Sequence, residues 1–374
     1  MKVDQLLLSE NNWKTKLSSI NFNPQVFLCF VANSFESKES VVQFLKASYP
    51  DALIAGCSTV ASISGVSVSN RDMCVTAIKF DNSTIKKVAV KIDSICGSEN
   101  AGEEIGKKLY NKDLKHVIVF SDGININGSD LVVGLKKKLH NVSVSGGLAS
   151  TNMEDNKNFV INDDDIVAKT VVGIGFYGDR LKIGNGSQGG WGSFGVERLV
   201  TKFNKNILYE IDGVPALTMY KKFLGDKLNA FLKKPDLTFS FSMRNGNSET
   251  RTVRAITGVN EDDQSLILGG NIYNNASVRL LKVTVDRLIN GAEASAIAAK
   301  LTDKTELAIL FSCVGRKNFL KQLVEEEVEV VSDILGENTC MTGFYAFGEI
   351  GPFKNLSTCE LHNQTMTITT ITEC

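Results

Sequence analysis

The sequence repeats one pattern three times, and this repeat constrains the fold more than any other feature. Each copy predicts a short apolar strand, an amphipathic helix, a second strand ending in glycine and an antiparallel tail. The three first strands are predicted over residues 26–30, 117–123 and 307–313. A strand–helix–strand unit of this kind forms a right-handed parallel crossover. We therefore expect a mixed α/β fold of layered mixed sheets flanked by helices, built from repeated strand-helix-strand-hairpin units.

The other parts of each copy follow at similar spacings. The helices are predicted over residues 38–47, 129–140 and 317–331, the second strands over 52–59, 142–147 and 340–345, and the tails over 73–80, 167–176 and 359–371. Ligands bind open α/β sheets at the carboxyl ends of their parallel strands. Polar residues that follow the first and second strands of each copy are therefore the candidates for a site.

A chain of 374 residues is long for a single core, so two domains are expected. The charged stretch that ends at Pro235 is the best boundary, because proline stops a helix. The predicted division is an N-terminal helix over 1–24, one domain over 25–232 and a second over 233–374. The many glycines around Trp191, in residues 184–195, predict close backbone approach.

Composition excludes several classes of protein. The net charge of −1 gives no field for nucleic acid. No stretch reaches the roughly 20 apolar residues of a membrane span, and the first residues do not resemble a signal peptide. The eight cysteines are spread singly, mostly within apolar strands, which is typical of buried free thiols in a reducing compartment. We expect a cytoplasmic protein; the oligomeric state stays open.

The strongest polar cluster lies in the third copy. Arg316 opens the predicted helix, where a cation opposes the helix dipole. A bound anion or an internal carboxylate such as Glu349 would compensate it, and a guanidinium suits either. Both interpretations stay open. In the first, Arg316 is the anion contact, and Glu349, Tyr345 and Cys313 shape the site.

Cys313 and His362 suggest two further hypotheses. A cysteine at a helix N-terminus has a lowered thiol pKa, and with a histidine it would form a nucleophilic pair. No third residue can be assigned to orient that pair, so we expect a binding protein and not an enzyme. His362 could instead be a single axial ligand to haem. A lone histidine is more often structural, so no cofactor is expected and haem is the alternative.

The first two copies carry polar groups at the equivalent positions. Ser58, Thr59 and Asp122 follow predicted strands, and Gly146 and Gly147 offer free backbone N–H groups. The competing interpretation is that the glycines only permit close packing of a helix on a strand. Residues 173–178 match the G-x-G-x-x-G pattern, but a strand and not a helix is predicted to follow them, so no dinucleotide site is expected.

These motifs, in this order, resemble the FIST family of bacterial and archaeal sensory proteins, which carry paired N- and C-terminal FIST domains. The resemblance runs from about residue 25 to residue 369 and rests on residues 56–59, 120–123, 146–149, 190–191, 200–201, 211–216, 220, 311–316, 343–345, 348–350 and 361–365. The sequence departs from the family at Ala61 and Ser62, where Gly and Glu are usual. It departs again at Ser150 and Thr151, where an Asp often stands.

The resemblance implies a sensory module that binds a small, carboxylate-bearing, amino-acid-like ligand. It implies a separate signalling partner, such as a histidine kinase, a chemotaxis protein, or a cyclase or phosphodiesterase. Some FIST proteins resemble haem-based nitric oxide sensors that regulate a histidine kinase, which is the alternative function. The residues assigned to the ligand site are Arg316, Glu349, Tyr345, Cys313, Gly343, Ser58, Thr59, Asp122, Gly146, Gly147 and Trp191, with His362 as the ligand of haem in the alternative.

Overall fold

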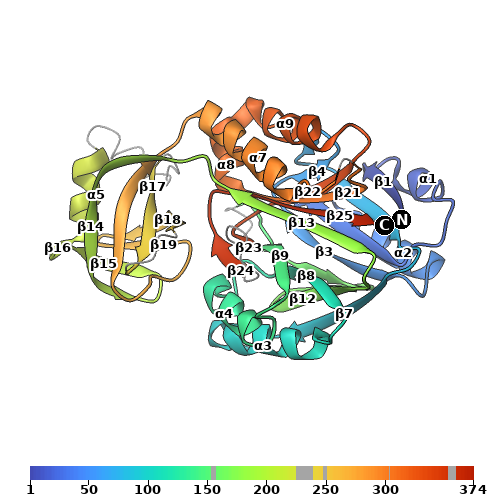
Figure 1. Cartoon of the computed structure of the whole chain (residues 1–374), viewed down its shortest axis with the longest axis horizontal. Coiled ribbons are helices and arrows are strands. Elements are labelled where there is room, and N and C mark those ends of the chain that lie inside the picture. The colour runs from blue at the N-terminus through green and yellow to red at the C-terminus, as the bar shows by residue number, and fades with distance from the viewer. Residues whose placement is uncertain (153–156, 225–238, 247–250, 303, 353–358) are drawn as a thin grey trace.

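The computed structural model describes the chain except for residues 153–156, 225–238, 247–250, 303 and 353–358. A large body contains three six-stranded sheets, and a smaller lobe beside it contains one seven-stranded sheet (Figure 1). Helices make up 25% and strands 45% of the chain. The predicted mixed α/β class with layered mixed sheets is confirmed.

The three sheets of the body have the same internal order, so the repeat in the sequence is also a repeat in space. The first sheet runs β1 (Lys2–Leu8), β6 (Met73–Lys79), β2 (Val26–Ala32), β3 (Leu53–Thr59), β10 (Val160–Asn162), β11 (Asp165–Val167). The second runs β7 (Thr84–Lys91), β12 (Thr170–Tyr177), β8 (Leu114–Ser121), β9 (Ser143–Leu148), β23 (Glu349–Pro352), β24 (Cys359–His362). The third runs β13 (Leu181–Gln188), β25 (Met366–Glu373), β21 (Leu307–Cys313), β22 (Cys340–Ala346), β4 (Ser62–Ser64), β5 (Ser67–Ser69).

Each copy gives a hairpin to the sheet of another copy. The hairpin β4–β5 follows β3 of the first sheet but pairs with β22 of the third. In the same way β10 follows β9 but pairs with β3, and β23 follows β22 but pairs with β9. The copies therefore interlock, and no sheet is complete without chain from a second copy. The hairpin strands are three or four residues long, too short for the sequence pattern to assign them.

One face of each sheet meets the other two in a common core. The first strands contribute equivalent, fully buried rings, which are Phe30, Phe120 and Phe311. Phe344 joins them, with ring centroids 5.0 Å from Phe30 and 5.7 Å from Phe311. The opposite face of each sheet is covered by two helices. These are α1 (Trp13–Leu17) and α2 (Lys38–Ser48) on the first sheet, α3 (Ser98–Leu109) and α4 (Gly128–Lys138) on the second, and α7 (Val285–Ala299) and α9 (Glu326–Leu335) on the third (Figure 1).

Each second strand holds a glycine at the same position, at residues 56, 146 and 343. A Cβ atom at Gly146 would lie 2.0 Å from the carbonyl oxygen of Val119 on the neighbouring strand. The other two glycines meet the equivalent carbonyl at 1.8 and 2.1 Å. Only a hydrogen atom fits there. The close approach is between two strands, and not between a helix and a strand as the competing interpretation had it.

The prediction of an N-terminal helix over residues 1–24 is wrong for its first part. Residues 2–8 form β1, which pairs along its whole length with β6, and only the short α1 follows. The run of leucines in this segment shows no strand alternation. Its backbone is recruited by the open edge of the first sheet, a tertiary effect that overrides local preference.

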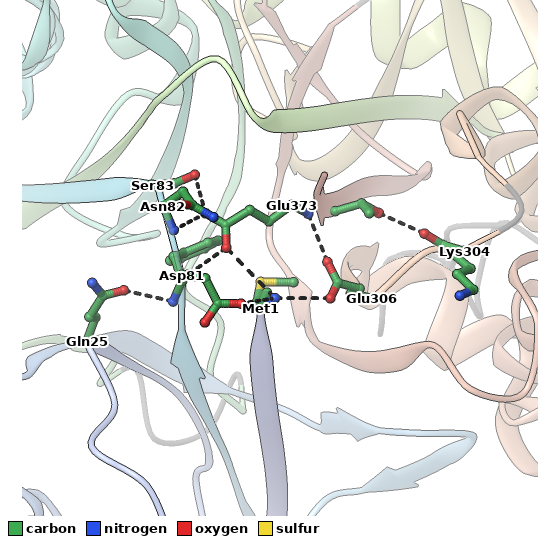
Figure 2. A network of polar contacts seen from close by, with 10 residues as sticks. Met1, Gln25, Asp81, Asn82, Ser83, Lys304, Glu306 and Glu373 are labelled. Atoms are coloured by element: carbon green, nitrogen blue, oxygen red, sulfur yellow. Dashed lines mark hydrogen bonds and ion pairs between the residues drawn. The ribbon is translucent and has the colours of Figure 1, made fainter.

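Residues near both ends of the chain connect the first sheet to the third. Figure 2 shows the ammonium group of Met1 among three carboxylates, at 3.0 Å from Asp81, 3.2 Å from Glu306 and 3.8 Å from Glu373. Glu373, the last residue of β25, also accepts a hydrogen bond of 2.8 Å from the backbone N–H of Asn82. The loop after β6 is therefore bound to β25.

The helix predicted over residues 317–331 is two helices. The first, α8 (Val314–Leu320), ends where Lys321 takes a positive φ of 54°, and α9 begins after a short 3₁₀ turn. The break turns α9 so that Glu327 faces the body and meets Arg316 of α8.

Among its described residues the lobe contains the helix α5 (Ala216–Leu224) and a sheet with the order β14 (Gly192–Asn204), β20 (Ala276–Lys282), β17 (Phe239–Asn245), β18 (Arg251–Asn260), β19 (Ser265–Leu268), β15 (Ile207–Ile211), β16 (Val214–Pro215). The boundary expected between residues 232 and 233 lies outside the described residues. The lobe takes strands from both sides of it, and so does the body.

The glycine-rich stretch before the lobe lies under α7. A Cβ atom at Gly186 of β13 would lie 1.9 Å from the carbonyl oxygen of Ser295, which confirms the predicted close approach. All eight cysteines are free thiols, and five are buried, as predicted. Within the described part of the chain, no helix has both the length and the apolar composition to cross a membrane.

Candidate functional site

The third copy brings Cys313, Glu349 and Thr365 together where its strands end. Glu349 begins β23 and lies opposite Gly147 of β9, so two residues predicted from different copies are neighbours. Thr365 donates to Glu349 Oε2 through its backbone N–H at 3.0 Å and its hydroxyl at 2.9 Å. The backbone N–H of Cys313 donates to the Thr365 carbonyl at 3.2 Å. Thr365 belongs to the segment 361–365, which includes the end of β24 and the turn into β25.

The Glu349 carboxyl group is fully buried and only half satisfied. Burial raises the pKa of Glu349 to about 8, although hydrogen bonds from Thr365 and Cys313 and the charge of Arg316 act in the opposite direction. The group is therefore mostly protonated at neutral pH. Its Oε1 atom has no hydrogen-bond partner among the residues that the structure describes. A buried polar atom without a partner needs a water or a ligand to explain it.

Gln364 supplies a second such atom. Its side chain is 1% exposed, and Nε2 has no hydrogen-bond partner within the described part of the chain. Its backbone has a positive φ of 62°, which directs the turn into β25. The Gln364 carbonyl accepts a bond of 3.1 Å from Trp191 Nε1, so Trp191 is held against the same segment. The sequence analysis missed Gln364 and Thr365, because neither burial nor a left-handed turn is visible in the motif.

Arg316 is fully buried and binds protein acceptors. Its Nε and Nη2 atoms each lie 2.8 Å from Glu327 Oε2, and the Tyr345 hydroxyl donates to Glu327 Oε1 at 2.7 Å. Nη1 donates to the Gly189 carbonyl at 3.0 Å. The internal carboxylate is thus Glu327 and not Glu349. Glu327 was missed because it ends an acidic run that is typical of a solvated helix face.

Ser58 and Thr59 are also engaged with the protein. Thr59 Oγ1 accepts from the Tyr345 backbone N–H at 3.1 Å and lies 2.9 Å from the Tyr345 carbonyl. Ser58 Oγ donates to the Ser150 carbonyl at 3.1 Å. The predicted residues of the first and third copies do come together, and the contact joins the end of β3 to β22.

Asp122 organises its own loop. Its carboxylate accepts backbone N–H groups from Ile124 and Asn125, each at 2.8 Å, and from Lys169 at 2.7 Å. Three backbone donors saturate much of its capacity. Asp122 therefore stabilises the turn after β8 in this structure, and its predicted ligand contact stays a prediction.

Cys313 does not have the lowered pKa that a nucleophile needs. Burial, and then the nearby charge of Glu349, raise the pKa of the Cys313 thiol well above its usual value. Burial also lowers the pKa of His362 to about 4, so the imidazole is neutral at pH 7. A neutral imidazole gives the thiolate no ion-pair partner.

His362 is the predicted axial ligand of haem in the alternative function. An axial ligand must present a free ring nitrogen to a space that holds the macrocycle. His362 is 3% exposed, and its Nε2 lies 3.1 Å from the Gly351 carbonyl. Two cavities in the described part of the chain, one in the lobe and one beside α1, are lined by other residues. As placed, His362 does not fit haem, and no group of three metal-binding side chains occurs in the described ranges.

Comparison with known families places the chain. Residues 25–214 match the model of the FIST N domain, and residues 216–352 match that of the FIST C domain. The chain therefore belongs to the FIST family, as its motifs predicted. FIST domains are sensory, signal-transduction modules.

Two solved structures align over nearly the whole length of both chains. One is a chorismatase, with 7% identity, a TM-score of 0.37 and coverage of 99% of this chain and 98% of the other. The second is a cyanuric acid hydrolase from A. caulinodans, with 8% identity, a TM-score of 0.35 and coverage of 100% and 98%. Similarity this low supports no conclusion about fold or function. No curated relative matches the sequence.

Proposed function

We propose that this chain is a sensory module whose buried cluster at Glu349 binds a small carboxylate-bearing, amino-acid-like ligand and signals to a separate protein. One observation carries the proposal: Glu349 Oε1 and Gln364 Nε2 are buried polar atoms without partners, on segments joined by Thr365. A protonated Glu349 and the Gln364 amide are both hydrogen-bond donors. A ligand carboxylate would accept from both.

The protonated form of Glu349 is compatible with an anionic ligand. A neutral carboxyl group does not repel an anion, whereas an ionised one would. The raised pKa of Glu349 provides the neutral form at physiological pH. Arg316 has the role of a positioning residue in this proposal, because it binds the Gly189 carbonyl and so fixes the loop that carries Trp191. Ligand entry requires this loop to move aside.

The position of the cluster gives it a route to the molecular surface. Residues 361–365 contact the lobe as well as Glu349. Arg254 of the lobe donates to the Leu361 carbonyl at 2.9 Å, and the Ala255 N–H donates to Asn363 Oδ1 at 3.3 Å. A ligand that reorders this segment would therefore move the lobe, and a change in the lobe is what a partner protein would detect.

The test is a thermal-shift screen of the full chain against the twenty amino acids and short mono- and dicarboxylates. At least one should raise the melting temperature of the wild type, because a ligand that binds only the folded state stabilises it. The shift should be lost in Glu349→Leu and in Gln364→Met. Glu360→Leu, which removes a carboxylate from the adjacent strand, should keep it. An equal shift in Glu349→Leu would refute the site.

A further inference from the structure

The lobe contains an apolar cavity that is separate from the Glu349 cluster. Its volume is about 210 Å³, and it lies between α5 and one face of the β14–β20–β17 sheet. The lining is almost wholly apolar and includes Phe194, Val196, Met219, Phe223, Phe241 and Leu280. An engineered cavity of roughly 150 Å³ with a similar lining holds benzene. The lobe cavity therefore has room for a ring, or a short alkyl chain, with a small polar group.

One charged residue lines this cavity. Arg198 on β14 lies opposite Val278 of β20, which directs its side chain to the cavity face of the sheet. Its Nη1 atom pairs with Asp212 at 2.9 Å, but its Nε–H is buried and has no acceptor among the described residues. A buried donor of a charged group without an acceptor is unfavourable. The cavity thus combines an apolar space with an unused charged donor.

The strand β14 is irregular where it lines the cavity. The pairing of β14 with β20 is interrupted between Phe194 and Arg198, and Gly195 within the interruption has a positive φ of 72°. Phe194 is 51% and Val196 is 65% exposed, although both line the cavity. Large apolar side chains exposed at the rim of a cavity are typical of a binding site. The irregular strand forms the mouth.

We infer that the lobe cavity binds a small hydrophobic carboxylate, an arylalkyl or medium-chain alkyl acid, with its carboxylate on Arg198. The apolar body would fill the space under α5, and the carboxylate would accept from Nε. The Arg198–Asp212 pair restrains the guanidinium and competes with the ligand for it. This site is independent of the proposed function at Glu349, because the two share no residue.

The test uses calorimetric titration of the full chain with 3-phenylpropionate and octanoate, and with the corresponding alcohols. The acids should bind more tightly than the alcohols. Arg198→Met should weaken acid binding at least about tenfold and leave alcohol binding nearly unchanged, because only the charged hydrogen bond is lost. Asp212→Asn should strengthen acid binding, since it frees the guanidinium. Asparagine also tolerates the positive φ of 51° at this position.

Two further variants keep the test decisive. Val278→Met fills the cavity and should weaken the binding of acids and alcohols alike. Lys202→Met removes a cation from β14, where the Lys202 side chain is 64% exposed. It should change the affinity neither for the acids nor for the alcohols. Melting temperatures confirm that each variant is folded. No heat from either acid at millimolar concentration, or equal acid affinity in wild type and Arg198→Met, would overturn the inference.

Discussion

At the scale of single residues, burial decides what each polar group of the motifs does. Arg316, Glu327 and Tyr345 are fully buried and satisfy one another, so they form a closed network. Glu349 and Gln364 are equally buried, but each keeps one atom without a partner. The same residue types thus fall into two groups, one whose polar atoms are satisfied within the protein and one that keeps an atom without a partner among the described residues.

The raised pKa of Glu349 predicts a specific dependence of stability on pH. Between the usual value of 4.5 and about 8, the folded chain keeps a proton that the unfolded chain has lost. Unfolding releases that proton, so rising pH favours the unfolded state through this window. The contribution of this group is a loss of up to about 1.4 kcal/mol per pH unit.

Glu349→Gln removes this titration. We expect the free energy of unfolding of the variant to fall less steeply with pH than that of the wild type between pH 5.5 and 7.5. Urea unfolding at three pH values measures both slopes. Other titrating groups affect both proteins equally and cancel in the difference. Parallel slopes would show that Glu349 titrates normally.

At the scale of elements, the glycines of the second strands are a requirement of the repeat. Gly146→Ala would place a methyl group 2.0 Å from the Val119 carbonyl, in a backbone that cannot move away. We expect a loss of stability of roughly 3 kcal/mol or more. Gly97→Ala is the matched control, because its nearest neighbour is 3.8 Å away, and it should change stability by less than about 1 kcal/mol. Chemical denaturation compares the two, and a similar small change in both would contradict the steric account.

The elements also show where local sequence patterns are sufficient. Short apolar runs identified the first strands of all three copies, because those strands are buried along their whole length, and amphipathic periodicity identified the helices of the first two copies. Residues 2–8 and the exchanged hairpins were missed or misassigned. Their conformation depends on an open sheet edge that a distant strand supplies. The helix predicted for the third copy breaks at Lys321, and the break allows Glu327 to pair with Arg316, a contact that the local sequence pattern does not reveal.

At the scale of the whole molecule, polar contacts attach the lobe to the body, and those of Arg254 are among them. Arg254 is 2% exposed and donates to the carbonyls of Leu361 at 2.9 Å and Asn271 at 3.2 Å. Asn271 in turn donates to Asp130 at the start of α4, at 2.7 Å. Arg254 is therefore one of the residues that couple the lobe to the segment beside Glu349, together with Ala255, whose N–H donates to Asn363 Oδ1.

Arg254→Met should loosen this attachment without unfolding either part. We expect faster amide hydrogen exchange in residues 361–365, because the Leu361 carbonyl loses its partner and the segment its anchor. Arg251→Met is the matched control on the same strand, since Arg251 pairs with Glu197 within the lobe. Hydrogen exchange followed by mass spectrometry separates the two variants. Unchanged exchange in 361–365 would show that Arg254 does not restrain the segment.

The sequence by itself determined the threefold repeat, the mixed α/β class and the family, because these depend on local periodicity and on motifs contiguous in the chain. Tertiary structure alone decided the exchange of hairpins, the pairing of Arg316 with Glu327 and the isolation of the Glu349 oxygen. It also decided that Arg198 faces a cavity. Each of these depends on which distant segments share an edge or a buried volume, and burial sets both the pKa of a group and the partners it can reach.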